Sequence, residues 1–249
     1  MRFLGMDGCP GGWACLYWDG AQGLDILRLP TVEAAMAHLG PEGFAAVDMP
    51  IGLPERSFPG GREAERAVRP LLGQRQSSVF SVPSRAAVEA GTDETIPDLE
   101  RYRHACTVAR ATSEPPRSIS KQCFAIFPKI REIDLLLQRR PDLLPRLWEC
   151  HPEVSFRTML GGPVPVAKKV KGRISADGLA FRRERLAQAG FPVADLTQDT
   201  ARRWRMGWDD LVDAAACAWT AWRIGTGVAL SFPDPPERDA KGLPVAIRA

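Results

Sequence analysis

The sequence lacks the signals of several protein classes. Its six cysteines in 249 residues include no C-x-x-C pair, which excludes a thiolate zinc site and argues against a disulfide framework. No stretch approaches the roughly 20 apolar residues that a membrane span needs. The first residues, MRFLGMDG, carry no long apolar segment before a small-residue cleavage site. We therefore expect a cytoplasmic chain with no membrane partner.

Common catalytic motifs are absent as well. The sequence has no G-x-S-x-G, H-E-x-x-H or G-x-G-x-x-G, and its three histidines give little support to a Ser–His–Asp triad. The GCPGG run at residues 8–12 is not a Walker loop, because no G-K-[ST] follows it. The composition is that of an ordinary globular protein, with 45% hydrophobic and 25% charged residues. No internal repeat or clear linker divides the chain, so we predict one domain over residues 1–249.

The charge is unevenly distributed along the chain. The net charge of +3 is too small to identify a nucleic-acid-binding protein by itself. However, residues 1–55 hold seven Asp and Glu against two Arg, whereas residues 157–185 hold eight Lys and Arg against two acidic residues. This asymmetry is consistent with a metal-collecting site that faces an anion-binding surface. Taken alone, the asymmetry favours the simpler interpretation, a solvated surface of uneven charge.

The pattern of apolar residues and turns predicts an α/β fold with a mixed sheet. Three short strands separated by the turn signals GCPGG and Asp19-Gly20 predict an antiparallel meander, and a helix then leads to a buried, parallel fourth strand. Residues 50–143 interrupt this order with a largely helical insertion, and a Pro-rich tail of loop and peripheral strand begins at Ser231. The expected strands are 2–7, 13–18, 24–29, 44–50 and 146–151, and the expected helices are 31–38, about 62–72, 98–112, 120–140, 177–189 and 208–224, with a connection over 161–173.

Five carboxylates fall at strand ends or on the last helix. Asp7 closes the first strand, Asp48 closes the fourth, and Glu149 lies near the end of the next one. Asp210 and Asp213 are three residues apart and share one helix face. If the first and fourth strands are adjacent and parallel, their ends lie about 4.8 Å apart. Two carboxylates at that spacing repel by roughly 3–4 kcal/mol at an effective dielectric constant near 20, and a cation would remove this cost. The all-oxygen ligand set favours Mg²⁺ or Mn²⁺ over zinc.

Each of these acidic residues also has a purely structural interpretation. An Asp at a strand end is often a turn former, and an Asp at a helix start complements the helix dipole, which suffices for Asp210. Asp48 and Asp213 are harder to explain in this way, because apolar residues surround both and a buried carboxylate needs a partner or a metal. The alanines beside Asp213 predict a helix that packs closely on the sheet, with or without chemistry.

Several polar residues are candidates for contacting an anionic substrate. They lie in a polar loop, in two lysine-containing segments and beside Glu149, where a histidine would act as an acid or orient a water molecule. For any one of them, an ordinary surface position or a simple hydrogen bond is the alternative. The candidates are Arg75, Ser78, Arg85, Lys121, Lys129 and His151, with Lys168, Lys169 and Lys171 as further possible phosphate contacts.

Six ordered motifs give the chain a resemblance to a known family. They are GMDGCPGGW (5–13), VDMPIGLP (47–54), LLGQRQSSVFSVPSR (71–85), ISKQ with PKIREID (119–134), ECHPEVSF (149–156) and DDLVDAAACAWTA (209–221). Together they resemble the domain of unknown function 429 family, whose members are predicted to be RNase H-like nucleases. The resemblance extends from residue 2 to about residue 225.

The resemblance implies a fold and a set of roles. The fold is a five-stranded mixed sheet in the order 3-2-1-4-5, flanked by helices, with the insertion at about 50–143 covering the site. Asp7 is similar to the first-strand metal ligand of that fold, Asp48 or Glu149 supplies the next carboxylate, and Asp210 with Asp213 resembles the pair on the final helix. In this interpretation Asp7 and Asp48 bridge the metals, Glu149 and Asp213 complete the coordination, and Asp210 assists them or is itself a ligand.

The leading hypothesis is therefore a nuclease that hydrolyses DNA or RNA by a two-metal carboxylate mechanism. Two alternatives stay open. One is an actin-like ATPase or small-molecule kinase on the same fold, with the Gly-rich hairpin at 8–12 holding phosphates, although no second D-x-G-G turn is present. The other is a non-catalytic binding module whose carboxylates are structural.

Overall fold

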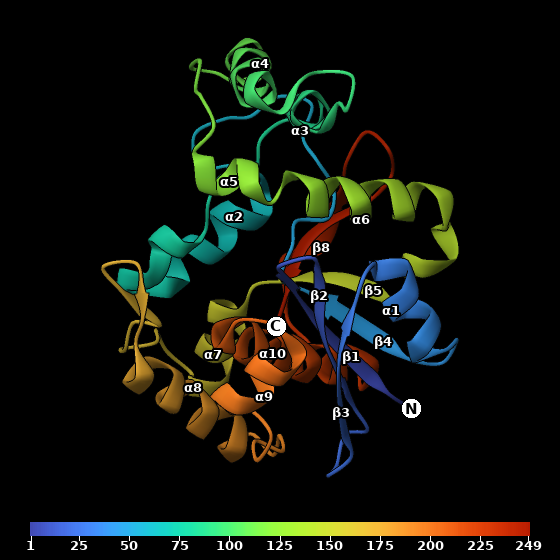
Figure 1. Ribbon diagram of the computed structural model, residues 1–249, viewed down its shortest axis with the longest axis vertical. Coiled ribbons are helices and arrows are strands. Elements are labelled where there is room, and N and C mark those ends of the chain that lie inside the picture. Colours follow the sequence, from blue (N-terminus) through green and yellow to red (C-terminus); the bar gives the residue numbers. More distant parts are fainter.

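A seven-stranded mixed sheet forms the centre of the protein, whose computed structural model describes residues 1–249 (Figure 1). The strand order is β3-β2-β1-β4-β5-β9-β8. The first five positions confirm the predicted order 3-2-1-4-5 and have RNase H-like topology. The strands are β1 (Phe3–Cys9), β2 (Gly12–Trp18), β3 (Leu24–Leu29), β4 (Phe44–Val47), β5 (Leu147–Cys150), β8 (Ser231–Arg238) and β9 (Pro244–Arg248).

Local turn chemistry produces the antiparallel meander of β1, β2 and β3. Gly11, between β1 and β2, has φ +70°, a conformation that glycine adopts without a steric penalty. Between β2 and β3 the Asp19 carboxylate accepts hydrogen bonds from the backbone N–H groups of Ala21 (2.8 Å) and Gly23 (3.0 Å), and Gly20 has φ +84°. Both turn predictions are confirmed.

The last long helix covers one face of the sheet. α10 (Trp208–Gly225) packs on β1, β2 and β4, and most of its residues are buried. Its backbone comes so close to β1 that a Cβ atom on Gly5 would lie 1.9 Å from the carbonyl oxygen of Ala214 and 2.2 Å from the amide nitrogen of Ala218. The predicted close packing of this alanine-rich helix is therefore confirmed, and Gly5 is its counterpart on the sheet.

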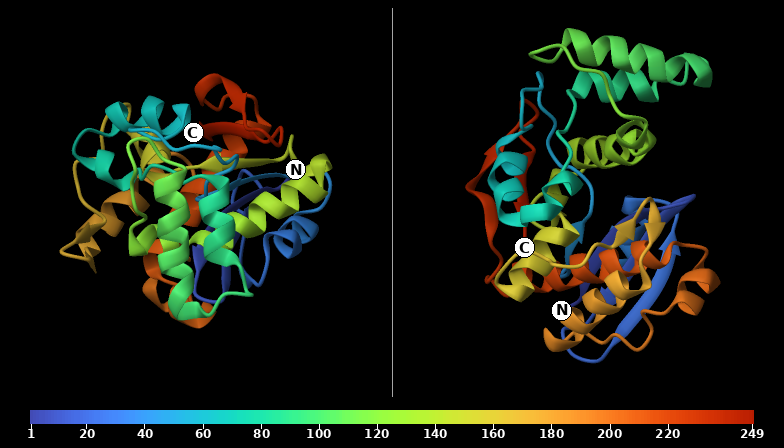
Figure 2. Two further views of the ribbon diagram at one scale, coloured as in Figure 1. Left: turned by 90° about the horizontal axis from the view of Figure 1, so that it is seen from above. Right: turned by 90° about the vertical axis from the view of Figure 1, so that its left-hand side faces the viewer.

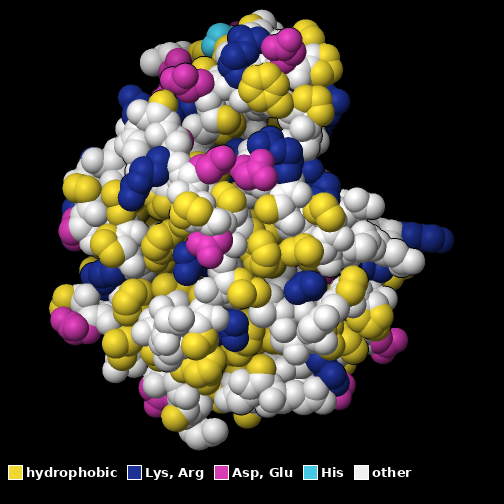
Figure 3. All heavy atoms as spheres, turned by 180° about the vertical axis from the view of Figure 1, so that it is seen from behind, with side chains coloured by type: hydrophobic (Ala, Val, Ile, Leu, Met, Phe, Trp, Pro, Cys, Tyr) yellow, Lys and Arg dark blue, Asp and Glu magenta, His cyan; other side chains and the backbone are white.

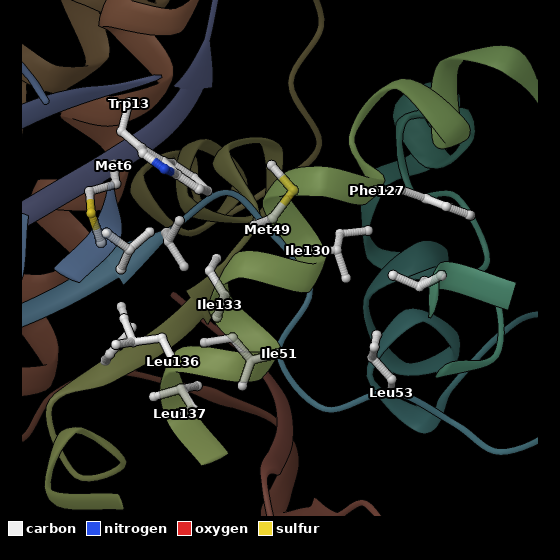
Figure 4. Close-up of a cluster of buried hydrophobic side chains, with 14 of the residues drawn as sticks. Met6, Trp13, Met49, Ile51, Leu53, Phe127, Ile130, Ile133, Leu136 and Leu137 are labelled. Atoms are coloured by element: carbon white, nitrogen blue, oxygen red, sulfur yellow. The ribbon is translucent and has the colours of Figure 1, made fainter. Parts of the chain in front are cut away.

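Helices α1 (Val32–Leu39) and α6 (Phe127–Arg139) pack on the opposite face of the sheet. Figure 4 shows Met6 and Trp13 from the sheet and Met49 from the segment after β4 facing Ile130 and Ile133 of α6. These side chains belong to one buried hydrophobic cluster. The segment that leads into the insertion thus shares a core with the meander.

The predicted insertion after β4 is present and helical. In the right-hand view of Figure 2, the green helices α3 and α4 lie farthest from the blue strands, with α6 between. The elements are α2 (Glu63–Val68), the 3₁₀ segment η1 (Arg69–Ser78), α3 (Arg85–Thr92), α4 (Asp98–Ala111), α5 (Lys121–Ala125), α6 and the 3₁₀ turn η2 (Pro141–Leu143).

Three helices were not predicted from the sequence: α3, α7 (Pro152–Leu160) and α9 (Gln198–Trp204). They are short, so their apolar periodicity is weak, but each has a starting signal. Ser84 and Thr197 accept capping hydrogen bonds from Ala87 N and Thr200 N, and Pro152 occupies the first turn of α7. Pro152 ends the preceding strand as expected, and it also begins a helix.

The remaining part of the chain adds a ribbon, a helix and a terminal hairpin. Within and just after the expected connection 161–173, β6 (Lys169–Val170) and β7 (Arg173–Ile174) form a two-stranded ribbon, and α8 (Ala176–Gln188) follows. β8 and β9 extend the main sheet. Between them, Asp239 accepts a hydrogen bond from Leu53 N (2.9 Å) and forms an ion pair with Arg85, so it braces the segment after β4. No helix has the length and apolarity needed to cross a membrane.

Candidate metal centre

Three aspartates that are far apart in the sequence converge at one end of the sheet. Asp7 lies on β1, Asp48 directly follows β4, and Asp213 lies on α10. One carboxylate oxygen from each lies within 4.8 Å of the others. β1 and β4 are parallel with Met6 opposite Val47, and Asp48 N donates a hydrogen bond to Met6 O (2.9 Å). Asp7 and Asp48 therefore occupy equivalent positions where this pairing ends, although β1 does not end at Asp7 as predicted but continues to Cys9 beside β2. The close approach of α10 to β1 supplies the third carboxylate.

Burial makes this cluster of negative charge costly. Asp7 is 9% exposed and Asp213 is 2% exposed. Burial, together with the charges of Asp48 and Asp213, raises the pKa of Asp7 well above its usual value. Burial also raises the pKa of Asp48 to about 6, although the charges of His151 and Lys168 oppose that shift. The site therefore favours protonation or the arrival of a cation.

The hydrogen bonds of the cluster leave oxygen atoms free. Gly8 N donates to Asp7 Oδ1 (2.6 Å), and Lys168 Nζ forms an ion pair with Asp213 Oδ2. Asp213 Oδ1 is buried and has no hydrogen-bond partner. A buried carboxylate oxygen without a partner, in a set of donors that are all oxygen, fits a hard divalent cation such as Mg²⁺ or Mn²⁺.

Asp210 lies beside the cluster and is also engaged by the helix start. Its Oδ2 accepts a hydrogen bond from Gly207 N (2.9 Å), as in the capping role considered from the sequence. Burial raises its pKa to about 6, and its charge contributes to the raised pKa of Asp7. Asp210 is therefore close enough to act on the cluster, although it is not one of the three converging aspartates.

Glu149 has partners other than the three aspartates. Its Oε1 accepts from Arg62 Nη2 (2.6 Å), and its Oε2 accepts from Ile51 N (2.8 Å). In the parallel register Glu149 is opposite Val47, one residue before Asp48, and successive strand residues point to opposite faces. Both oxygens are thus occupied, and a role as a metal ligand stays a prediction that this arrangement does not favour.

A cavity of about 280 Å³ opens beside the aspartates, between the sheet and the insertion. Four of the predicted substrate contacts line it: Ser78, Lys129, His151 and Lys168. Lys129 Nζ lies 4.4 Å from the centroid of the Trp13 ring and donates to Gly12 O. His151 Nε2 lies 3.3 Å from Ser78 O, and its buried Nδ1 has no partner.

The other predicted substrate contacts do not line this cavity. Arg85 is buried in ion pairs with Asp134 and Asp239, which gives it a structural role. The carbonyl of Arg75 accepts a hydrogen bond from Ser78 Oγ (2.8 Å), and Lys121 is exposed at the start of α5. Substrate contact by these residues stays a prediction.

Sequence reasoning missed two groups that line the cavity or support its walls. Glu153, in the first turn of α7, lines the cavity and pairs with the fully buried Arg182. Arg62 bridges Glu65 and Glu149 and donates to the carbonyls of Ile51 and Gly52 (2.7 Å each). The sequence did offer a signal for Glu153, because this acidic residue lies next to apolar residues in ECHPEVSF (149–156).

Charge on the molecular surface is mixed where it can be seen in Figure 3. On that face, acidic and basic side chains are interspersed with hydrophobic ones. Basic residues at the start of the β6–β7 ribbon form ion pairs with aspartates of α10. Lys168, just before β6, pairs with Asp213, and Lys169 pairs with Asp209 (2.7 Å). The basic segment of the sequence is therefore paired with aspartates of α10 at this site, and its pairs do not involve the acidic residues 1–55.

A family model described as "Protein of unknown function (DUF429)" matches residues 5–238. No curated protein and no solved structure gives a significant match. The matched range contains all three converging aspartates and every residue that lines the cavity except Ile247.

Proposed function

This chain belongs to the DUF429 family, and from that premise we propose that it is a divalent-metal-dependent phosphodiester hydrolase acting on DNA or RNA. The observation that carries the proposal is the convergence of Asp7, Asp48 and Asp213 within 4.8 Å on an RNase H-like topology. These three carboxylates would hold the cation, which we expect to be Mg²⁺ or Mn²⁺ because all the donors are oxygen.

When bound, divalent cations in carboxylate sites of this kind lower the pKa of a water molecule and stabilise charge on the departing oxygen. The side chains of the protein would supply the contacts to the substrate and the group that orients water or exchanges a proton. Lys129 and Lys168 reach the cavity with positive charge that a phosphodiester needs. His151 has a ring nitrogen without a partner at the cavity wall, where it can orient water or exchange a proton.

The test is a cleavage assay on purified protein. Single-stranded, double-stranded and branched DNA and RNA are incubated with Mg²⁺ or Mn²⁺, with EDTA as the blank. Asp7→Asn and Asp213→Asn should lose activity by at least the roughly 10–100-fold that follows loss of residues supporting a metal ligand. Asp199→Asn is the matched control, because Asp199 is exposed and paired only with Arg202 at the surface.

The outcomes separate the proposed nuclease from its rivals. Metal-dependent cleavage that both site variants abolish supports the proposal, and cleavage that survives them rejects it. ATP hydrolysis or stabilisation by ATP–Mg²⁺ without any effect of oligonucleotides would favour the ATPase or kinase. A melting temperature that does not respond to Mn²⁺ would favour the non-catalytic module, since a ligand that binds only the folded state raises stability.

A further inference from the structure

A fourth carboxylate faces the same cavity with one oxygen free. Glu153 is 5% exposed and lines the cavity together with Asp7, Asp48 and Lys168. Its Oε1 accepts from Arg182 Nε (3.1 Å) and Nη2 (2.5 Å). Its Oε2 is buried and has no hydrogen-bond partner. A buried carboxylate oxygen is rarely left in this state unless a ligand completes it.

Arg182 holds this carboxylate in place. The side chain is fully buried, and its Nη1 donates to Val166 O (3.0 Å) and Gly178 O (2.9 Å), so the guanidinium is fixed from two sides. The guanidinium also lies 5.5 Å from the centroid of the Phe156 ring. Because Oε1 is bound to this rigid group, the position of Oε2 is set before any ligand arrives.

The charge of Glu153 acts on the aspartate cluster. It raises the pKa of both Asp48 and Asp213, so the three carboxylates interact. Mg²⁺ takes about six oxygen ligands, keeps several of them as water and is held by one or two carboxylates, so one further carboxylate beside the aspartates would be enough to hold a second cation. Glu153 is the cavity-lining glutamate with an unpartnered oxygen, whereas both oxygens of Glu149 are occupied.

We propose that Glu153 contributes Oε2 as the fourth carboxylate ligand of the metal centre, that it completes a second divalent-cation site beside Asp48 and Asp213, and that Arg182 positions it. This inference rests on the proposed function, because it assumes that the three aspartates bind metal. It assigns to Glu153 the role that sequence reasoning gave to Glu149.

Mn²⁺ titration of the full-length protein tests this inference without an activity assay. Calorimetry or electron paramagnetic resonance counts the bound ions in the wild type and in Glu153→Gln, which keeps the amide oxygen that Arg182 needs but removes the charge. We expect two ions in the wild type, and one ion or a second affinity weakened at least about 10-fold in the variant. Glu184→Gln is the control, since Glu184 is exposed on the same helix as Arg182.

Each result bears on one of the two proposals. If Glu153→Gln binds both ions as tightly as the wild type, or if Glu149→Gln loses the second ion instead, the assignment of Glu153 is overturned. If the wild type binds no Mn²⁺, the proposed metal-dependent function is itself overturned, and the assignment of Glu153 is overturned with it. Glu153→Asp, which keeps the charge but withdraws the carboxylate, should also weaken the second ion, and it provides the result if Glu153→Gln does not fold.

Discussion

Lys168 and Asp213 form an ion pair in which the lysine contacts one carboxylate oxygen and leaves the other, buried one without a partner. The charges of Asp48 and Asp7 also act on Lys168 and, with Asp213, raise its pKa. The ammonium group therefore neutralises part of the cluster in the absence of metal. It also competes for the oxygen atoms that a cation needs.

Lys168→Met should separate these two effects. We expect the metal-free protein to lose about 1–3 kcal/mol of stability, less than for a fully buried pair because the lysine side chain is 24% exposed. We expect Mn²⁺ to raise the melting temperature of the variant more than that of the wild type. Lys169→Met is the matched control, because Lys169 is half exposed and pairs with Asp209 instead. Equal Mn²⁺-induced shifts in both variants would contradict this competition.

The raised pKa of Asp48 predicts a pH dependence with a definite sign. The folded-state pKa of about 6 lies above the value of about 4 expected in the unfolded chain, so the native state binds the proton more tightly. The charged carboxylate thus destabilises the metal-free protein above about pH 6, and this cost is relieved as the pH falls toward 4. Asp48→Asn should therefore stabilise the EDTA-treated protein by about 2–3 kcal/mol more at pH 7.5 than at pH 4.

Urea unfolding at the two pH values measures this difference. Asp199→Asn, at an exposed position, should show no such change between them. In the wild type, Mn²⁺ affinity should weaken as the pH falls below about 6, because a carboxylate must be deprotonated to bind metal. An effect of Asp48→Asn that is the same at both pH values would contradict the assigned charge cost.

Gly5→Ala tests how the packing of α10 places Asp213. A Cβ atom at residue 5 would overlap the backbone of Ala214, which cannot move without shifting the helix. We expect a loss of about 3 kcal/mol in stability and weaker Mn²⁺ binding, because Asp213 would move away from Asp7. Gly162→Ala is the control, since no atom lies within 4 Å of its added Cβ. Native Mn²⁺ affinity in folded Gly5→Ala protein would show that the site tolerates helix displacement.

The parts of the site that depend on local signals could be predicted from the sequence. Asp7 and Asp48 follow buried apolar runs, and the parallel pairing of the two strands brings these positions together. Asp213 interrupts an apolar helix, which requires a partner for its charge. In each case a short segment contains both the residue and the reason for its position.

The parts that depend on register or on distant partners could not be predicted. The pairing of Val47 with Glu149 places Glu149 one position before Asp48 in the register, where Arg62 and the backbone N–H of Ile51 occupy its two oxygens. Arg85 lies in a polar loop that looks suited to anions, but its partners Asp134 and Asp239 are 49 and 154 residues away. The contact of Glu153 depends on Arg182, which is 29 residues away.

The brace between Asp239 and the segment after β4 has a consequence for biosynthesis. Leu53 and Arg85 are held by a residue that leaves the ribosome about 190 residues after Asp48, and α10 emerges only shortly before it. In a nascent chain, Asp7 and Asp48 are therefore synthesised long before Asp213 on α10, the third member of the cluster. A cation that requires all three aspartates would therefore bind only after α10 has been synthesised.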